Sequence, residues 1–144
     1  MNITKALKHK KKLLKQINES WNRFNQYNSH DEGETTPYKA KDEFINWLAL
    51  NNEFIDLKTK IHLANAPVYG KIFRMSELKS MITTLKRANT TEGIRSVYSQ
   101  GGYVDKKTVV EVGLLEVDNL IKAYKDEIEK IQEELEHHNS ITNI

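Results

Sequence analysis

Apolar side chains recur along most of this 144-residue chain at alternating intervals of three and four. Such spacing puts them on one stripe of an α-helix and is the heptad pattern of helices that pack side by side. Four stretches carry the pattern, and they predict helices near residues 3–27, 37–65, 76–88 and 114–138. The chain is therefore expected to be mainly all-α.

Each predicted helix has its own buried stripe, which we call its seam. In the first helix the predicted seam is Ile3, Leu7, Lys10, Leu14, Ile17, Trp21 and Phe24, with Ala6 and Leu13 widening one flank. In the second it is Trp47, Leu50, Phe54, Leu57, Ile61 and Ala64, with Phe44, Leu48 and Ile55 beside it. In the third it is Met75, Leu78, Ile82 and Leu85, and in the last it is Val117, Ile121, Tyr124, Ile128, Ile131, Leu135 and His138. Flanks this wide predict helices with more than one packing partner.

Capping residues suggest where the helices begin. Asn2 can cap the first helix, Thr36 before Pro37 the second, and Ser76 the third. Between the last two helices the character changes, because Gly101 and Gly102 interrupt the chain and residues 108–112 are β-branched in part. We predict a single domain over residues 1–144: a long-helix antiparallel bundle or coiled-coil hairpin with a small β-like insert near 94–113.

Composition narrows the classes of function. Charged residues make up 29% of the chain and hydrophobic residues 38%, which suits long helices with much exposed surface. The absence of cysteine excludes disulfides and thiolate chemistry. The chain starts without the apolar run of a signal peptide and has no stretch that could span a bilayer, so a cytoplasmic location without a membrane partner is expected.

The net charge is only +2, but the charges are unevenly placed. Six lysines and no carboxylate fall in the stretch 5–15 of the first helix, and four of them, Lys8, Lys11, Lys12 and Lys15, are candidate contacts for nucleic acid or another polyanion. The alternative, which we favour, is that these lysines are a solvated face balanced by the acidic final helix, since the two ends meet in an up-down bundle.

The motifs of common catalytic and metal sites are missing. The five histidines show no HExxH pattern and no i, i+4 pair, and Gly101-Gly102 lacks the rest of a phosphate-binding loop. We therefore predict no catalytic residue, no metal and no cofactor, and we do not expect an enzyme. Asn51 and Asn65, next to the second seam, are candidates for a polar core position or a small pocket.

The layout resembles a family of small bacterial proteins described as septicolysin-like. The resemblance lies in Glu32-Gly33-Glu34 in a loop after the first helix, in Ile61 to Asn65 at the end of the second, and in Ile131, Gln132 and Asn139 in the last. The family has an aromatic residue after that last Asn, where this chain has Ser140. The resemblance implies a helical, self-associating protein without an assigned reaction.

These features together predict a non-enzymatic, self-assembling helical protein or interaction module that forms a homo-oligomer. The rival prediction is a protein that binds nucleic acid or another polyanion through the lysine face of the first helix.

Overall fold

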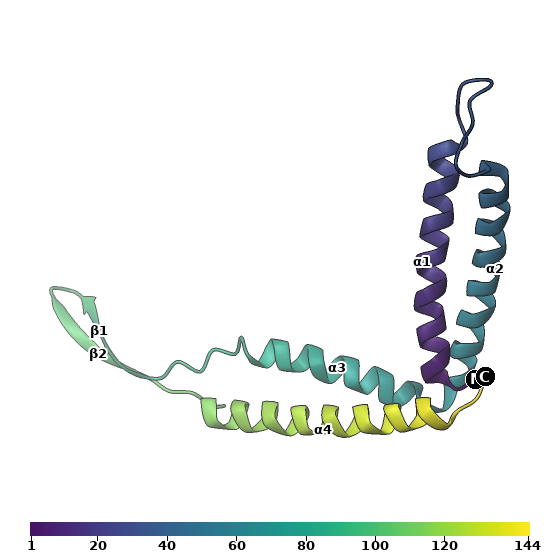
Figure 1. Cartoon of the computed structure of the whole chain (residues 1–144). Coiled ribbons are helices and arrows are strands. Elements are labelled where there is room, and N and C mark those ends of the chain that lie inside the picture. The colour runs from purple at the N-terminus through teal and green to yellow at the C-terminus, as the bar shows by residue number, and fades with distance from the viewer. The chain divides into compact units, whose positions relative to one another are not determined.

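The computed structural model of the chain describes residues 1–144 and is mainly helical (Figure 1). Its elements are α1 (Ile3–Tyr27), α2 (Ala40–Ala64), a short 3-10 turn η1 (Ala66–Val68), α3 (Tyr69–Leu85), the strands β1 (Gly93–Ser99) and β2 (Gly102–Thr108), and α4 (Leu114–Ile141). The prediction of a mainly helical chain with a small β insert is confirmed. The chain forms two compact units: a first unit of Met1–Tyr69 with Leu135–Ile144, and a second unit of Gly70–Glu134.

The start of α1 is fixed by its cap and by the end of the chain. The Asn2 Oδ1 atom accepts a hydrogen bond from the Lys5 amide at 2.9 Å, as predicted for a capping residue. The Ile3 amide donates to the Thr142 carbonyl oxygen, and the Ile144 amide donates to the Met1 carbonyl oxygen, each at 3.0 Å. Within the first unit the two chain termini therefore lie side by side.

The last turn of α4 is also tied to α2. The Nε2 atom of His138 lies 3.1 Å from the Ala64 carbonyl oxygen, which can only accept, so this nitrogen carries the proton. The Nδ1 atom lies 3.2 Å from the hydroxyl of Thr142. This contact agrees with the prediction that His138 ends the seam of α4, although the helix continues to Ile141 rather than stopping near residue 138.

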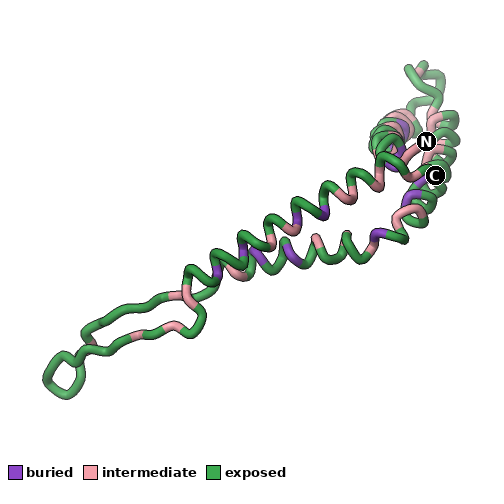
Figure 2. Tube along the Cα trace, turned by 90° about the horizontal axis from the view of Figure 1, so that it is seen from below, coloured by how far each residue is buried: buried purple, intermediate pink, exposed green.

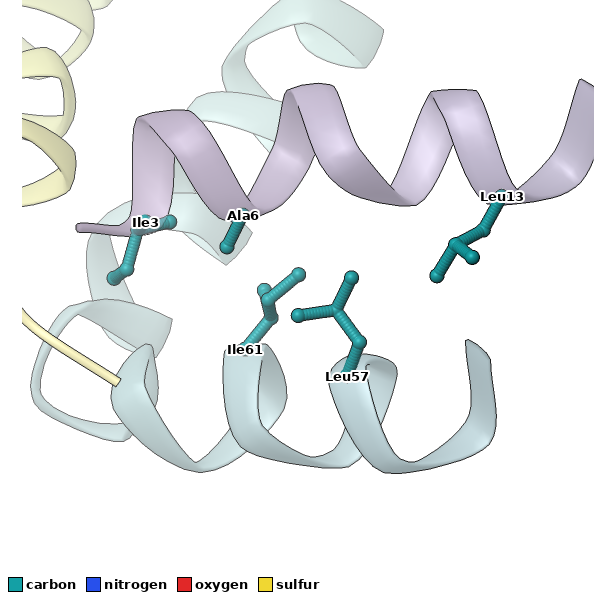
Figure 3. Packing of buried hydrophobic residues seen from close by; sticks show 5 residues of the cluster. All are labelled: Ile3, Ala6, Leu13, Leu57 and Ile61. Atoms are coloured by element: carbon teal, nitrogen blue, oxygen red, sulfur yellow. The ribbon is translucent and has the colours of Figure 1, made fainter. Parts of the chain in front are cut away.

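In the first unit α1 and α2 lie antiparallel, and their facing side chains form its core. Figure 3 shows the side chains of α1 and α2 directed toward one another in this core, which is built from Ile3, Ala6, Leu13, Leu57 and Ile61. Leu13 is 1% exposed and Ile3 is fully covered. Each buried side chain of this size stabilises the fold by about 1.5 to 3 kcal/mol.

The seam predicted for α1 is wrong in its phase. Its buried residues are Ile3, Ala6, Leu13, Ile17 and Ser20, whereas Leu14 and Trp21 are 42% and 41% exposed. Two heptad seams overlap on this helix and share every seventh residue from Ile3 onward, so the spacing fits both. Packing selects the one with small residues at Ala6 and Ser20, which lets α2 approach closely. The predicted seam of α2 has Leu57 and Ile61 buried and its other members half-buried.

Two predicted helix starts are also wrong. The second helix begins at Ala40 rather than at Pro37, because the Thr36 hydroxyl donates to the Tyr38 carbonyl oxygen instead of capping a helix. The third begins at Tyr69, seven residues before the Ser76 start. Pro67 interrupts the helix for the single turn η1, and the chain then continues helically through Gly70.

The second unit contains α3, most of α4 and the strands. The predicted seams hold here, since Leu78 and Ile82 of α3 and Val117, Ile121, Ile128 and Ile131 of α4 are buried. The strands β1 and β2 pair antiparallel through a two-residue turn at Gln100 and Gly101, both with positive φ. Hardly any residue of this hairpin is covered, as the unbroken green of its tip in Figure 2 shows.

The phase of the α1 seam can be tested with two neighbouring leucines. Leu13→Ala should destabilise the first unit by about 2 to 5 kcal/mol because it leaves a cavity in the core. Leu14→Ala, the matched control, should cost about 1 kcal/mol or less because this side chain is already half in water. Urea unfolding followed by circular dichroism, at a concentration where the protein is monomeric, measures both; a larger loss for Leu14→Ala would restore the originally predicted seam.

Candidate interaction surface

The α1–α2 pair has a polar side and an apolar side. On the polar side His9 Nε2 lies 2.9 Å from Glu53 Oε1, and Asn46 Nδ2 donates to Ser20 Oγ at 2.7 Å. Ser20 is 2% exposed and is the one polar residue in the buried set. The bond from Asn46 gives the Ser20 hydroxyl a partner, and burial of this hydroxyl without one would be unfavourable.

The opposite side of α1 carries Leu14 and Trp21, which are seven residues apart and share a face of the helix. Trp21 packs against Trp47 of α2 with ring centroids 5.2 Å apart, so this side includes the edge of the interface near Trp47. Leu14 is 42% and Trp21 is 41% exposed to solvent.

Helix geometry also places two α2 residues away from the polar side. Successive residues turn by 100°, so if Asn46 faces the polar side and Trp47 the interface, Leu48 faces away from the polar side. Ile55, one heptad later, lies on the same face as Leu48. Leu48 is 44% and Ile55 is 57% exposed. We call Leu14, Trp21, Leu48 and Ile55 the apolar side. The sequence prediction placed Leu48 and Ile55 on a stripe beside the seam of the second helix and expected stripes this wide to need a further packing partner.

Aromatic rings stiffen the end of the apolar side nearest the α1–α2 loop. Trp21, Phe24, Phe44 and Trp47 form a cluster with centroid separations of 5.1 to 6.2 Å. The Nζ atom of Lys41 lies 5.8 Å from the centre of the Phe44 ring. Rigid aromatic groups with a partly exposed face are the residue type that dominates binding at protein interfaces.

The lysine face of α1 is largely without ion pairs. Lys15 lies 3.9 Å from Glu19, while the five other lysines of this stretch have no carboxylate within ion-pair distance. Lys8 and Lys11 border a hollow of about 410 Å³ that Glu136 also lines. Of the four candidate polyanion contacts, the structure thus brings Lys8 and Lys11 to one place and gives Lys15 an acidic neighbour.

The two candidate pocket residues behave differently. The side-chain amide of Asn51 donates to the Trp47 carbonyl oxygen of its own helix at 2.8 Å. Asn65, at the end of α2, lines a hollow of about 380 Å³ together with Lys10, Lys58 and Tyr69. Its Oδ1 atom is buried without a hydrogen-bond partner. The sequence prediction noted Asn65 but not the two lysines beside it. Lys10 had been assigned to the core seam, and Lys58 had not been singled out.

Two ion pairs link α3 to α4 within the second unit. Lys71 lies 2.9 Å from Glu134, and Arg74 binds both carboxylate oxygens of Glu127, with 3.0 Å between Nη2 and Oε2. The hydrogen bond from Arg74, helped by its charge, lowers the pKa of Glu127, and the same bond raises the pKa of Arg74. These carboxylates face their own unit and are not the partners of the α1 lysines.

No helix is both long and apolar enough to cross a membrane. No three side chains of His, Asp or Glu lie together in the arrangement that a metal ion needs.

Comparison of the chain with family models, with curated proteins and with solved structures finds no match.

The Arg74–Glu127 pair predicts a measurable titration change. A carboxylate with a lowered pKa stabilises the fold fully above the ordinary glutamate value of about 4.3, and this contribution disappears as the pH falls through the lower folded value. In Arg74→Met the pKa of Glu127 should return toward its ordinary value, which NMR titration of the carboxyl carbon measures. Lys71→Met, the control, removes a neighbouring cation and should leave Glu127 unchanged. Equal titration of Glu127 in the parent and in Arg74→Met would contradict the pairing.

Proposed function

We propose that this protein is a non-enzymatic, self-assembling helical protein whose copies associate through the apolar side of the α1–α2 pair. The observation that carries the proposal is that Leu14, Trp21, Leu48 and Ile55, which lie away from the polar side of the two long helices, are each at least 41% exposed. Contiguous apolar surface rimmed by polar residues is typical of protein–protein interfaces.

A second copy of this chain fits the apolar side better than an unrelated partner. None of the four residues that define the apolar side is charged, and their order along the pair is complementary to itself. Trp21 and Leu48 lie at one level of the pair, near Trp47, and Leu14 and Ile55 lie about two turns away at the other. A two-fold axis that passes between these two levels would pack Trp21 of one copy against Leu14 and Ile55 of the other, and the reverse, as isologous contacts require. Such a dimer would be a four-helix antiparallel bundle of the coiled-coil type.

The septicolysin-like resemblance supports the same proposal. The family layout has a polar loop between the first two helices, and here Gly33 in Glu32-Gly33-Glu34 takes a positive φ of 83°, a conformation that favours glycine. Membership of that family, with self-association as its implied property, is part of the proposal.

Polyanion binding through the lysine face is the second candidate function. It is favoured by Lys5, Lys8, Lys11 and Lys12, which share one face of α1 and have no ion pair, since uncompensated cations on one helix face suit a phosphate backbone. It ranks second because the net charge of the chain is only +2.

The assembly can be broken at the apolar side. Leu48→Glu with Ile55→Glu should lower the mass of the oligomer, because desolvating two carboxylates in an apolar interface costs more than the contact supplies. Ala49→Glu with Leu63→Glu adds the same charge to exposed positions of the same helix outside the apolar side and should leave the mass unchanged. Light scattering on a sizing column gives both masses. A parent protein that elutes as a monomer at micromolar concentration would refute self-assembly.

Charge reversal of the lysine face separates the two candidate functions. Lys8→Glu, Lys11→Glu and Lys12→Glu together would place two carboxylates beside Glu136 and a third on the same helix, so the first unit should lose stability at low salt and regain it when salt screens charges beyond about 10 Å. The loss should be modest, about 0 to 1 kcal/mol for each exposed pair. The control carries the same charge change at Lys39, Lys58 and Lys60.

Retention on heparin provides the second readout of that experiment. If self-assembly is the function, neither the parent nor the triple variant should show salt-sensitive retention. A stable, assembled triple variant that has lost heparin or nucleic-acid binding present in the parent would reverse the ranking.

A further inference from the structure

The β1–β2 hairpin is a two-stranded sheet with two free edges. No backbone hydrogen bond joins either outer edge to another part of the chain. Large apolar side chains are exposed on it, among them Ile94 at 73% and Tyr98 at 67%. An isolated two-stranded hairpin is only marginally stable in water, so further strands or a covering surface would stabilise it.

The two edges differ in their charge. The β2 edge has Asp105, Lys106 and Lys107 in succession, and charged residues of this kind block pairing with another strand. The β1 edge has Arg95 as its one charge and is otherwise made of small, β-branched and aromatic residues. The β1 edge is therefore the one that is open to an added strand.

Strand β1 is complementary to itself. It runs from Gly93 to Ser99, so an antiparallel copy that overlaps it fully has its two-fold axis at Ser96. In that register Ile94 lies opposite Tyr98 of the other copy, a favourable aliphatic–aromatic cross-strand pair that occurs twice. Arg95 lies opposite Val97, so no like charges meet. The equivalent self-pairing of β2 about Asp105 or Lys106 would set two like charges directly opposite each other.

Backbone geometry allows this register. Hydrogen bonding alternates along an antiparallel pair, and Ser99 and Gly102 close the two-residue turn. The residues of β1 that bond to β2 are therefore Ser99, Val97, Arg95 and Gly93. Tyr98, Ser96 and Ile94 direct their N–H and C=O groups outward. A two-fold axis at Ser96 places these outward N–H and C=O groups opposite the outward C=O and N–H groups of the other copy, so that continuous inter-strand hydrogen bonds can form.

We propose that β1 pairs edge to edge with β1 of a second copy of this chain, and that the two hairpins form one four-stranded antiparallel sheet centred on Ser96. This pairing rests on the proposed self-assembly and adds a second contact between copies. In this sheet the two β2 strands form the outer edges, and their charged residues limit the sheet to four strands.

The chain has no cysteine, so single introduced cysteines test the pairing in the full-length protein. In Ser96→Cys the two thiols would lie on opposed residues whose Cα atoms are about 5.5 Å apart. In Asp105→Cys, the control, the thiols would be three strand spacings apart, about 14 Å. Both changes disrupt the same hydrogen bond, between Ser96 Oγ and Asp105 Oδ1.

Dibromobimane, a thiol cross-linker of short reach, should yield covalent dimer from Ser96→Cys and none from Asp105→Cys. Light scattering on both variants is done first. A monomer mass would overturn the proposed function and this pairing together, whereas an intact oligomer without cross-linking at position 96 would overturn the pairing alone. Cross-linking of Asp105→Cys, with or without Ser96→Cys, would mean pairing through β2 or random collision and would likewise overturn it.

Discussion

Two helices that pack on each other can bury only the stripe that each turns toward the other. In the first unit that stripe is narrow, with Ala6 and Ser20 allowing close approach and Leu13, Leu57 and Ile61 supplying the apolar area. Only the last turns of α4 add further cover, near the ends of the chain. Apolar residues outside the stripe, such as Leu14 and Ile55, have no partner element in the unit. Their exposure follows directly from having two long helices rather than three or four.

The same geometry explains why the two sides of the pair differ. Residues such as Ser20 and Asn46 complete a hydrogen bond across the interface and need nothing more from a partner. The exposed apolar area of Trp21 and Leu48 stays in water at a cost of about 25 cal/mol for each Å². Association recovers this free energy on the apolar side and would recover little on the polar side.

The sequence predicted most of the helical layout because heptad spacing reports how residues line up along a helix. It placed α1 at residues 3–27 and the buried line of α4 correctly. It could not choose between two seams of α1 that share Ile3, Lys10, Ile17 and Phe24, since that choice depends on which side chains α2 can approach. The start of α3 was missed for a related reason: Ser76 has the chemistry of a cap, but the helix had already begun after Pro67.

The candidate surfaces were harder to predict because they consist of what the fold leaves uncovered. Leu14, Leu48 and Ile94 are ordinary apolar residues in the sequence, and their significance appears only once packing has failed to bury them. The helical surface and the β1 edge belong to different units, and each is complementary to itself. A subunit with two isologous surfaces forms a dimer when one two-fold axis passes through both of them, and a larger assembly when each surface has its own axis. In the dimer the hairpin contact would reinforce the helical contact, whereas separate axes would give closed assemblies with an even number of subunits or open chains.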